Sequence, residues 1–451
     1  MAKYYFCGIA GSGMSALAQI VRFDGNQVSG SDRSFDSGDM KDIEKKLRNM
    51  GINIYAQDGF NISRDIDCFV ISTAVEDSNP EILEAKKKAL NIIHRSNLLS
   101  EYVNKFKTIA VGGTSGKTTT TAMIFDILNF SGFSPSIING GYLNSLISDK
   151  LIGNAFKGNG GFLVIEADES DSTIKKYYPE IGVLLNISKD HKSVEELKKI
   201  FEEFASNCNI VFANERDEFL LDILKDKKNI NFFGPESASL KIIESRMFYS
   251  RFLAYSNEFY IPFGGFHNIE NALAAISVSM HLGVKPSLIS KAIEQFKGTF
   301  RRFNIIGNKN GVTVIDDYAH NPAKISAMVK TLTQDKQRRL ILIYQPHGFA
   351  PTRMFKNDLI NLFLSYLRED DILLMPEIYY AGGSVIKDIS SKDIVEEISK
   401  YGKNAFYFKN RDLIFDFIRK NLKAQDIIAV MGARDNSLNK FARDIFEKYV
   451  I

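Results

Sequence analysis

The chain has 451 residues, of which 45% are hydrophobic and 25% are charged, a composition typical of a globular protein of about three domains. Its 57 Lys and Arg and 54 Asp and Glu leave a net charge of +3, which gives no reason to expect a nucleic acid or a membrane as partner. Three cysteines are too few and too scattered for a disulfide framework or a Cys-based zinc site. The N-terminus lacks a signal-peptide pattern, and no apolar run approaches the roughly 20 residues that span a bilayer. We therefore expect a cytoplasmic protein.

The first hundred residues alternate between strand-like and helix-like segments. Short apolar runs predict buried strands, and amphipathic runs between them predict helices. This alternation is typical of βαβ units that build a parallel sheet. The predicted strands are 4–9, 27–31 and 68–73, and the predicted helices are 14–23, 40–50 and 80–90.

Two further α/β units follow, which predicts domains at 1–105, 106–297 and 298–451. The second unit has predicted strands at 108–112, 162–167 and 181–187 and helices at 117–129, 194–207 and 268–281, while 229–265 indicates short strands and turns. The third unit alternates in the same way, which is a doubly wound pattern. Its predicted strands are 312–315, 340–344, 372–375, 405–408 and 427–430, and its helices are 322–332, 355–367, 391–401, 413–421 and 439–449.

A glycine-rich turn, Gly113–Thr118, follows a predicted strand and opens a helix. Glycines let several backbone N–H groups point at an anion, and the helix N-terminus adds partial positive charge. Lys117 can reach the β- and γ-phosphates of a nucleotide, and the Thr118 hydroxyl can bind Mg²⁺. The strict Walker pattern is not met, because Val111 stands where its first glycine belongs. An ordinary turn with a solvated lysine is the alternative, and a phosphate loop alone does not separate kinase, ATPase and ligase.

Polar residues follow the next two predicted strands. The acidic run Glu166–Asp171 comes directly after 162–165, and Asn186–His191 comes after 181–187. Carboxylates at the carboxyl end of a sheet strand are placed to hold a metal beside a nucleotide. A solvated acidic loop is the alternative for the first segment. A structural histidine is the alternative for His191, because Mg²⁺ prefers oxygen ligands.

A second glycine-rich turn, Gly8–Ser15, follows the first predicted strand. Its glycines would let a diphosphate approach the backbone at a helix N-terminus. Asp32 lies about where a dinucleotide-binding domain has its acidic residue, so this segment by itself leaves a dehydrogenase open. The phosphate loop argues against that alternative, because a simple dehydrogenase has no use for ATP.

In this order, the motifs resemble the Mur ligases, the ATP-dependent amide ligases of peptidoglycan precursor synthesis. The resemblance covers nearly the whole chain and is greatest to the branch that joins L-alanine to UDP-N-acetylmuramate. The motifs that carry it are Gly8–Ser15, Ser29–Asp32, Asn79-Pro80, Gly113–Thr121, Glu166–Asp171, Gly265–Asn268 with Asn271, Arg301–Phe303, Asp316–His320 and Gln345–His347.

The resemblance implies an N-terminal Rossmann-like domain that binds the UDP-sugar, a central P-loop-type domain that binds ATP, and a C-terminal Rossmann-like domain that binds the amino acid and closes over the site. It implies catalytic roles for Lys117, Glu166 and His191, with Mg²⁺ held by Thr118, Glu166 and His191. The other implied contacts are Gly113, Thr114, Ser115, Gly116, Thr119, Asn268, Asn271, Arg302, Asp317 and His320 for ATP; Gly11, Ser12, Gly13, Met14, Ser15, Ser31, Asp32, Ser72 and Thr73 for the UDP-sugar; and Asn321, His347 and Arg353 for the amino acid.

Several residues depart from the alanine-adding branch. Ser115 replaces its phosphate-loop histidine, Asn321 replaces a second histidine after His320, and Gly348 replaces an arginine. These changes leave the ATP chemistry intact but leave the acceptor open, so a ligase for another amino acid or for a recycled peptide is an alternative. From a different class, the alternative is a non-catalytic sensor that binds the UDP-sugar and ATP. The intact Lys117, Glu166 and His191 argue against such a sensor.

Overall fold

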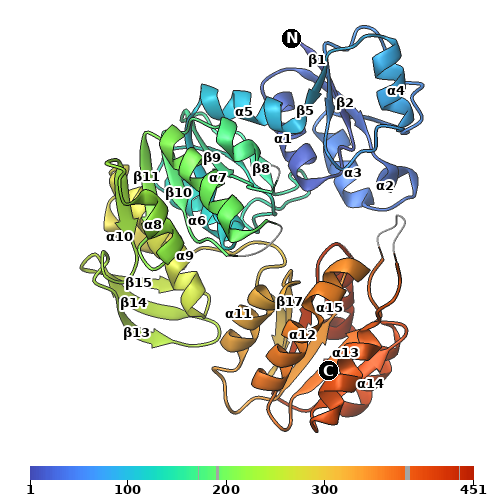
Figure 1. Ribbon diagram of the computed structural model, residues 1–451, viewed down its shortest axis with the longest axis vertical. Coiled ribbons are helices and arrows are strands. Elements are labelled where there is room, and N and C mark those ends of the chain that lie inside the picture. Colours follow the sequence, from blue (N-terminus) through green and yellow to red (C-terminus); the bar gives the residue numbers. More distant parts are fainter. Residues whose placement is uncertain (171, 189–191, 381–385, 436, 451) are drawn as a thin grey trace. The chain divides into compact units, whose positions relative to one another are not determined.

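The computed structural model describes residues 1–170, 172–188, 192–380, 386–435 and 437–450 (Figure 1). By its internal contacts the chain divides into two compact units. The first unit consists of 1–243, 251–262 and 269–299, and the second consists of 244–250, 263–268 and 300–451. None of the helices in the described part of the chain is long and apolar enough to cross a membrane.

The first unit begins with a five-stranded parallel sheet in the order β3-β2-β1-β4-β5. The order reverses on either side of β1, and the carboxyl end of a strand at such a switch point is where α/β sheets bind ligands. The glycine-rich turn after β1 occupies that place. The elements are β1 Lys3–Cys7, α1 Ser12–Phe23, β2 Gln27–Ser31, α2 Arg33–Asp36, α3 Lys41–Asn49, β3 Asn53–Tyr55, β4 Cys68–Ile71, α4 Pro80–Lys87, β5 Ile92–His94 and α5 Arg95–Lys105.

The same unit contains a seven-stranded sheet in the order β12-β11-β10-β6-β9-β7-β8. β6 lies between β10 and β9 and pairs with both in parallel, so the turns that follow these three strands meet at one edge. The elements are β6 Lys107–Gly112, α6 Lys117–Phe130, β7 Ser136–Ile138, β8 Ala155–Phe156, β9 Phe162–Glu166, η1 Thr173–Lys176, β10 Ile181–Leu184, α7 Val194–Asn207, β11 Ile210–Asn214, α8 Glu218–Leu224, β12 Ile230–Phe233, α9 Phe266–His281 and α10 Pro286–Glu294. A small sheet of β13 Lys241–Ser245, β14 Ser250–Ala254 and β15 Asn257–Ile261 follows β12.

The second unit is built on a six-stranded sheet in the order β16-β17-β21-β18-β19-β20. β17, β21 and β18 are parallel neighbours, and β16 is an antiparallel edge strand. The side chains of β18 alternate between two hydrophobic cores, one on each face of the sheet. Leu340 and Leu342 pack in one core, and Ile341 and Ile343 pack in the other. The elements are β16 Asn304–Lys309, β17 Val312–Asp317, α11 Pro322–Leu332, β18 Leu340–Tyr344, α12 Phe349–Tyr366, β19 Ile372–Pro376, α13 Ser391–Lys400, β20 Asn404–Phe408, α14 Leu413–Asn421, β21 Ile427–Met431 and α15 Ser437–Tyr449.

These sheets confirm the predicted α/β class, but several predicted elements need correction. α1 begins at Ser12 rather than at residue 14, and α12 begins at Phe349 rather than at residue 355. The glycine cap at Gly348 and the proline in the first turn of α12 are helix-start signals that the prediction did not use. Helix α5 and the edge strand β16 were not predicted.

Candidate functional site

The phosphate loop connects the end of β6 to the first turn of α6. Gly113 and Gly116 have φ values of +134° and +87°, which only glycine adopts readily. A Cβ atom at Gly116 would lie 2.4 Å from Oδ1 of Asn271. Asn271 comes from α9 and also accepts a hydrogen bond of 3.3 Å from Thr120. The predicted Asn271 therefore lies directly against the loop. The predicted Thr119 lies on the first turn of α6.

Asn186, at the end of the strand next to β6, holds the loop in shape. Its Oδ1 accepts hydrogen bonds from the Thr114 hydroxyl at 2.8 Å and from the Ser115 N–H at 2.9 Å. Its amide nitrogen donates to the Ser115 carbonyl at 3.0 Å. The Ser188 N–H donates to the Thr114 hydroxyl at 3.0 Å. Asn186 and Ser188 belong to a motif that the sequence singled out, yet no role was predicted for either residue.

Lys117 is buried and held by two partners. Its ammonium donates to the Gly113 carbonyl at 2.6 Å and forms an ion pair with Glu169, with Nζ 2.9 Å from Oε2 and 3.2 Å from Oε1. Burial lowers the pKa of Lys117, but the charges of Glu169 and Glu166 outweigh burial and the net pKa is raised. Lys117 therefore stays protonated, as a phosphate-binding lysine must. The sequence did not predict Glu169 as its partner.

The predicted magnesium ligands Thr118 and Glu166 lie together. The Thr118 hydroxyl donates to Oε2 of Glu166 at 2.9 Å, and the Gly140 N–H donates to the same oxygen at 3.0 Å. These two oxygens suit Mg²⁺, which is usually held by one or two side chains and completed by substrate phosphates and water. The described residues form no cluster of three His, Cys, Asp or Glu that would hold a metal unaided. His191 lies outside the described residues, so its predicted role is untested.

One loop near these residues, 139–141, was missed by the prediction. Gly140 comes so close to Glu166 that a Cβ atom there would lie 2.6 Å from Oε2, and one at Gly141 would lie 2.8 Å from Cγ2 of Thr118. The Asn139 side chain donates to the Thr118 carbonyl at 3.3 Å. The run of asparagine and glycines is the one signal in the sequence that points to this close approach.

Asn268 donates to the Gly264 carbonyl at 2.7 Å, and its predicted contact with ATP stays a prediction.

The turn after β1 presents its backbone at the start of α1. The N–H groups of Gly8 and Ile9 both donate to the Ser31 carbonyl at 2.9 Å. Oδ2 of Asp32 accepts from the Ala10 N–H at 2.9 Å, while Oδ1 caps α2 through Ser34. The Asp32 carboxylate therefore connects the turn after β1 to the start of α2. Gly11 and Ser12 are exposed, as a ligand-binding turn requires.

The side chains of Met14, Ser15 and Ser31 are buried, and the predicted contact of these residues with the UDP-sugar stays a prediction. The Met14 side chain packs in the hydrophobic core. The Ser15 hydroxyl is buried and accepts a hydrogen bond of 3.0 Å from Asn154. Ser31 is 0% exposed, and its hydroxyl donates to the buried Glu81 at 2.5 Å. These side chains face the interior, so only their backbone atoms are available to a ligand.

Arg95, which the sequence analysis did not single out, lies beside the turn after β1. A Cβ atom at Gly13 would lie 2.5 Å from Nη1 of Arg95, so the guanidinium lies over the first turn of α1. Ser72 and Thr73 follow β4, the strand next to β1, and Thr73 is exposed. A guanidinium beside a helix N-terminus brings two positive features to one place, which suits a diphosphate.

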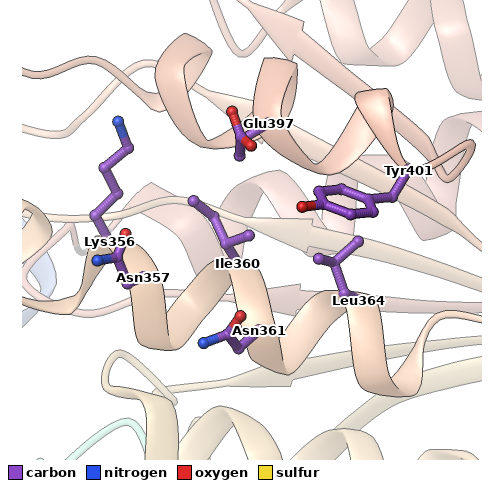
Figure 2. Close-up of a pocket in the computed structure, with 7 residues that line it drawn as sticks. All are labelled: Lys356, Asn357, Ile360, Asn361, Leu364, Glu397 and Tyr401. Carbon is purple, nitrogen blue, oxygen red and sulfur yellow. The ribbon is translucent and has the colours of Figure 1, made fainter.

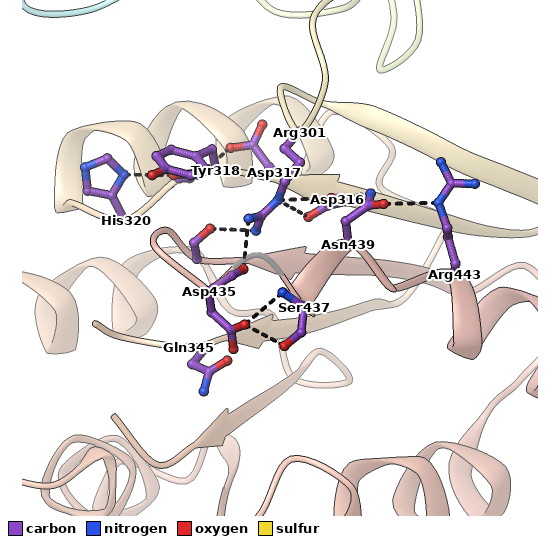
Figure 3. Close-up of polar contacts among 12 residues, drawn as sticks. Arg301, Asp316, Asp317, Tyr318, His320, Gln345, Asp435, Ser437, Asn439 and Arg443 are labelled. Carbon is purple, nitrogen blue, oxygen red and sulfur yellow. Dashed lines mark hydrogen bonds and ion pairs between the residues drawn. The ribbon is translucent and has the colours of Figure 1, made fainter. Parts of the chain in front are cut away.

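Asp317 is the last residue of β17 in the second unit, and His320 follows that strand (Figure 3). Asp317 accepts hydrogen bonds from the N–H groups of Phe303 at 2.6 Å and Ala319 at 2.7 Å, and burial raises its pKa. Burial lowers the pKa of His320 to about 3, so the ring is neutral at pH 7. Its Nδ1 lies 2.8 Å from the Tyr318 carbonyl. The predicted Arg302 places its guanidinium carbon 5.4 Å from the Tyr318 ring centre.

A buried ion pair supports this edge of the sheet (Figure 3). Both carboxylate oxygens of Asp316 lie 3.2 Å from Nε of Arg301, and Asn439 donates to one of them at 2.8 Å. Arg301 also donates to the carbonyls of Gly432 and Asp435, which follow β21. Arg301 therefore connects the end of β17 to the loop after β21 and is a buried, structural residue.

The three predicted amino-acid contacts lie in the second unit, at the start of α11, after β18 and on α12. Asn321 caps α11 by accepting from the Lys324 N–H at 3.0 Å. The ring of His347, after β18, lies 5.4 Å from that of His320. Arg353, on α12, forms an ion pair with Asp388. Asn321 and Arg353 thus already have partners within the chain.

A separate groove of about 430 Å³ lies between α12 and α13 (Figure 2). It lies along the helices and not at the carboxyl ends of the strands, and the residues predicted for the three substrates lie elsewhere. Its lining residues are Lys356, Asn357, Ile360, Asn361, Leu364, Glu397 and Tyr401.

Three family models match successive parts of the chain: the catalytic domain of the Mur ligase family at residues 3–107, the Mur ligase middle domain at 111–279, and the glutamate ligase domain of Mur ligases at 301–434. Among curated proteins, UDP-N-acetylmuramate–L-alanine ligase of Carboxydothermus hydrogenoformans is 34% identical over 96% of this chain and 94% of its own. The protein of the same name from Geobacter sulfurreducens is 35% identical over 96% of this chain and 94% of its own.

Solved structures agree with these matches. UDP-N-acetylmuramate–alanine ligase of Thermotoga maritima superimposes with a TM-score of 0.82 at 27% identity, covering 100% of this chain and 99% of that one. A murein peptide ligase of Psychrobacter arcticus superimposes with a TM-score of 0.68 over 100% of both chains. Its identity of 21% supports the shared fold alone.

Proposed function

Because the chain belongs to the Mur ligase family of ATP-dependent amide ligases, we propose that it joins L-alanine to the carboxylate of UDP-N-acetylmuramate. The names of its curated relatives support this choice of substrates. We also propose the domain boundaries 1–105, 106–297 and 298–451, and a cytoplasmic location, where ATP and UDP-sugars are available.

The observation that carries the proposal is the arrangement of Lys117, Thr118 and Glu166 around one turn of backbone. A buried ammonium, a hydroxyl and a carboxylate come from adjacent elements, β9 and α6, and Thr118 is 2.9 Å from Glu166. This set neutralises the charge of a triphosphate and orients its terminal phosphoryl group. A protein that only bound the UDP-sugar would not need it.

The reaction needs two steps, because a carboxylate oxygen is a poor leaving group. First, a carboxylate oxygen of UDP-N-acetylmuramate attacks the γ-phosphorus of ATP, the bond from that phosphorus to the bridging oxygen breaks, and ADP leaves. Then the free amine of L-alanine attacks the carbonyl carbon of the acyl phosphate. The tetrahedral intermediate expels inorganic phosphate and loses a proton from nitrogen, which leaves the amide. Positioning and charge neutralisation supply most of the acceleration in such phosphoryl transfers.

The residues of the first unit have defined tasks in this scheme. The N–H groups of the loop from Gly113 to Thr118 bind the phosphates, and Lys117 neutralises charge on the transferred group. Asn186 and Asn271 keep the loop in its binding shape. Thr118 and Glu166, with His191, are the residues we assign to Mg²⁺, which when bound neutralises phosphate charge.

We assign the UDP-sugar to the turn after β1 and the amino acid to the second unit. Backbone groups from Gly11 to Ser15 receive the diphosphate together with Arg95, and Ser72 and Thr73 border the same strand ends. His347 and Arg353, with Asn321, are the residues we assign to L-alanine. Asp317, His320, Arg302 and Asn268 remain our candidates for the nucleotide.

The test is release of inorganic phosphate by the purified protein with MgATP, UDP-N-acetylmuramate and L-alanine. We expect phosphate release to require all three and to match formation of UDP-N-acetylmuramoyl-L-alanine by mass spectrometry. Binding of the UDP-sugar and ATP without turnover would instead establish the sensor. Turnover with a peptide but not with L-alanine would establish a recycling ligase.

A further inference from the structure

The Lys117 ammonium has three N–H donors, and the chain itself provides three acceptor oxygens for them. These are the Gly113 carbonyl at 2.6 Å and the two Glu169 oxygens at 2.9 and 3.2 Å. The side chains of Lys117 and Glu169 are only 11% and 8% exposed, so water replaces these partners poorly. A phosphate group that binds the Lys117 ammonium must therefore displace the Glu169 carboxylate from it.

The backbone fixes Glu169 at this position. The Ala167 N–H donates to the Val111 carbonyl on β6 at 2.9 Å, which ties the acidic loop to the strand that leads into the phosphate loop. The Glu169 carbonyl accepts a hydrogen bond of 3.1 Å from the Ser172 N–H. The carboxylate is thus held beside Lys117 by the same strand pairing that shapes the loop.

The ion pair also offsets the electrostatic repulsion between Lys117 and the N-terminus of α6. Lys117 is the first residue of α6, where the helix N-terminus carries partial positive charge and disfavours a cation. A carboxylate or a phosphate at this place relieves that repulsion. Glu169 and the phosphates of a nucleotide are chemically equivalent in this respect, which makes them competitors for one ammonium.

We propose that Glu169 is a positioning residue that competes with the nucleotide for Lys117. In the absence of nucleotide, Glu169 holds the ammonium in the loop through the ion pair. This ion pair breaks when the γ-phosphoryl group of ATP binds Lys117, and it forms again once that group has been transferred. The competition weakens nucleotide binding and favours the departure of ADP. This inference rests on the proposed ATP site and adds a residue that sets how tightly that site holds its nucleotide.

Glu169→Gln tests the competition, because it keeps the size of the side chain and removes its charge. We expect the Kd of the β,γ-imido analogue of ATP with Mg²⁺, measured by calorimetry, to fall at least fivefold. The KM for ATP should fall with it, while the KM values for UDP-N-acetylmuramate and L-alanine stay within twofold. Asp168→Asn is the matched control, because it removes the same charge from the neighbouring, exposed residue. Its Kd should change much less.

An unchanged or larger Kd in Glu169→Gln would overturn the inference, since a purely structural or metal-binding role predicts equal or weaker binding. If that variant does not fold, Glu169→Asp decides, because its shorter side chain loosens the pair and should also lower the Kd. If the unmodified protein binds no ATP analogue, the ATP site itself is wrong and the inference falls with it. Binding by the unmodified protein without tightening in the variants rejects the competition alone.

Discussion

The Thr118 hydroxyl donates a hydrogen bond of 2.9 Å to the Glu166 carboxylate and thereby joins the first turn of α6 to the end of β9. Val111 on β6 is in register with Glu166 on β9, so the strand pairing determines where this carboxylate lies relative to the loop. The register of the strands therefore brings Glu166 to Thr118.

Replacing Glu166 with Gln should impair magnesium-dependent catalysis. The amide keeps the hydrogen-bonding shape but loses the charge, so we expect kcat/KM to fall at least tenfold, about 1.4 kcal/mol. We also expect the Mg²⁺ concentration for half-maximal activity to rise. Activity over a Mg²⁺ titration is the measurement, and the exposed Glu195→Gln serves as control. A normal Mg²⁺ dependence would remove Glu166 from the metal site.

Lys117→Ala should abolish ligation while leaving UDP-sugar binding within twofold. Losing one positioned donor to developing charge costs about 2.7–4 kcal/mol, roughly 10²–10³ in rate. The loss leaves Glu169 buried without its cation, so the variant should also melt at a lower temperature. Lys198→Ala, which breaks an ion pair with Asp222 at the surface, is the control. Substantial turnover by Lys117→Ala would contradict the proposed phosphate loop.

Arg95→Ala should weaken binding of UDP-N-acetylmuramate. A charge-assisted hydrogen bond contributes about 1.5–3 kcal/mol, so we expect the Kd to rise roughly 10- to 150-fold. The Kd of the ATP analogue should not change, because the phosphate loop lies on a different sheet. The exposed Arg64→Ala in the same part of the chain is the control. Equal affinities for the UDP-sugar would show that Arg95 has no role in holding the diphosphate.

The acceptor site should tolerate side chains larger than that of L-alanine. Gly348 lacks the guanidinium and the volume that an arginine would place there. Its φ of +71° also makes simple replacement by arginine strained. We expect kcat/KM for larger amino acids or short peptides to lie within a hundredfold of that for L-alanine, about 2.7 kcal/mol. A larger preference for L-alanine would mean that neighbouring side chains refill the space.

Asp126→Asn should stabilise the protein at neutral pH. Burial raises the pKa of Asp126 from 3.8 to about 6, so folding favours its protonated form. The folded state therefore binds more protons than the unfolded state between about pH 4 and 6, and stability falls as the pH rises through this range. The variant removes this penalty while its carbonyl can still accept from Ser145.

We expect the free energy of unfolding of Asp126→Asn to rise by about 1–2 kcal/mol at pH 7.5 and to change little at pH 4. Urea denaturation at both pH values is the measurement, with the exposed Asp149→Asn as control. Equal effects at the two pH values would show that the charge of Asp126 carries no penalty.

Much of the ATP site could be predicted from the sequence, because its signals are contiguous. The turn Gly113–Thr118 combines glycines, a lysine and a hydroxyl within one loop, and the strand before it and the helix after it follow from local periodicity. The acidic run from Glu166 could be found in the same way, since it directly follows a buried strand. Such patterns act between near neighbours, so no tertiary contact is needed to recognise them.

The pairing of residues distant in the chain was decided only by tertiary structure. Lys117 meets Glu169, and Gly13 meets Arg95, because the order of parallel strands brings the loops after β6 and β9, and after β1 and β5, to common edges. The hydrogen bond between the buried Ser31 and Glu81 has the same origin. A local pattern records which groups are present, whereas sheet order and packing determine which groups face a ligand and which face one another.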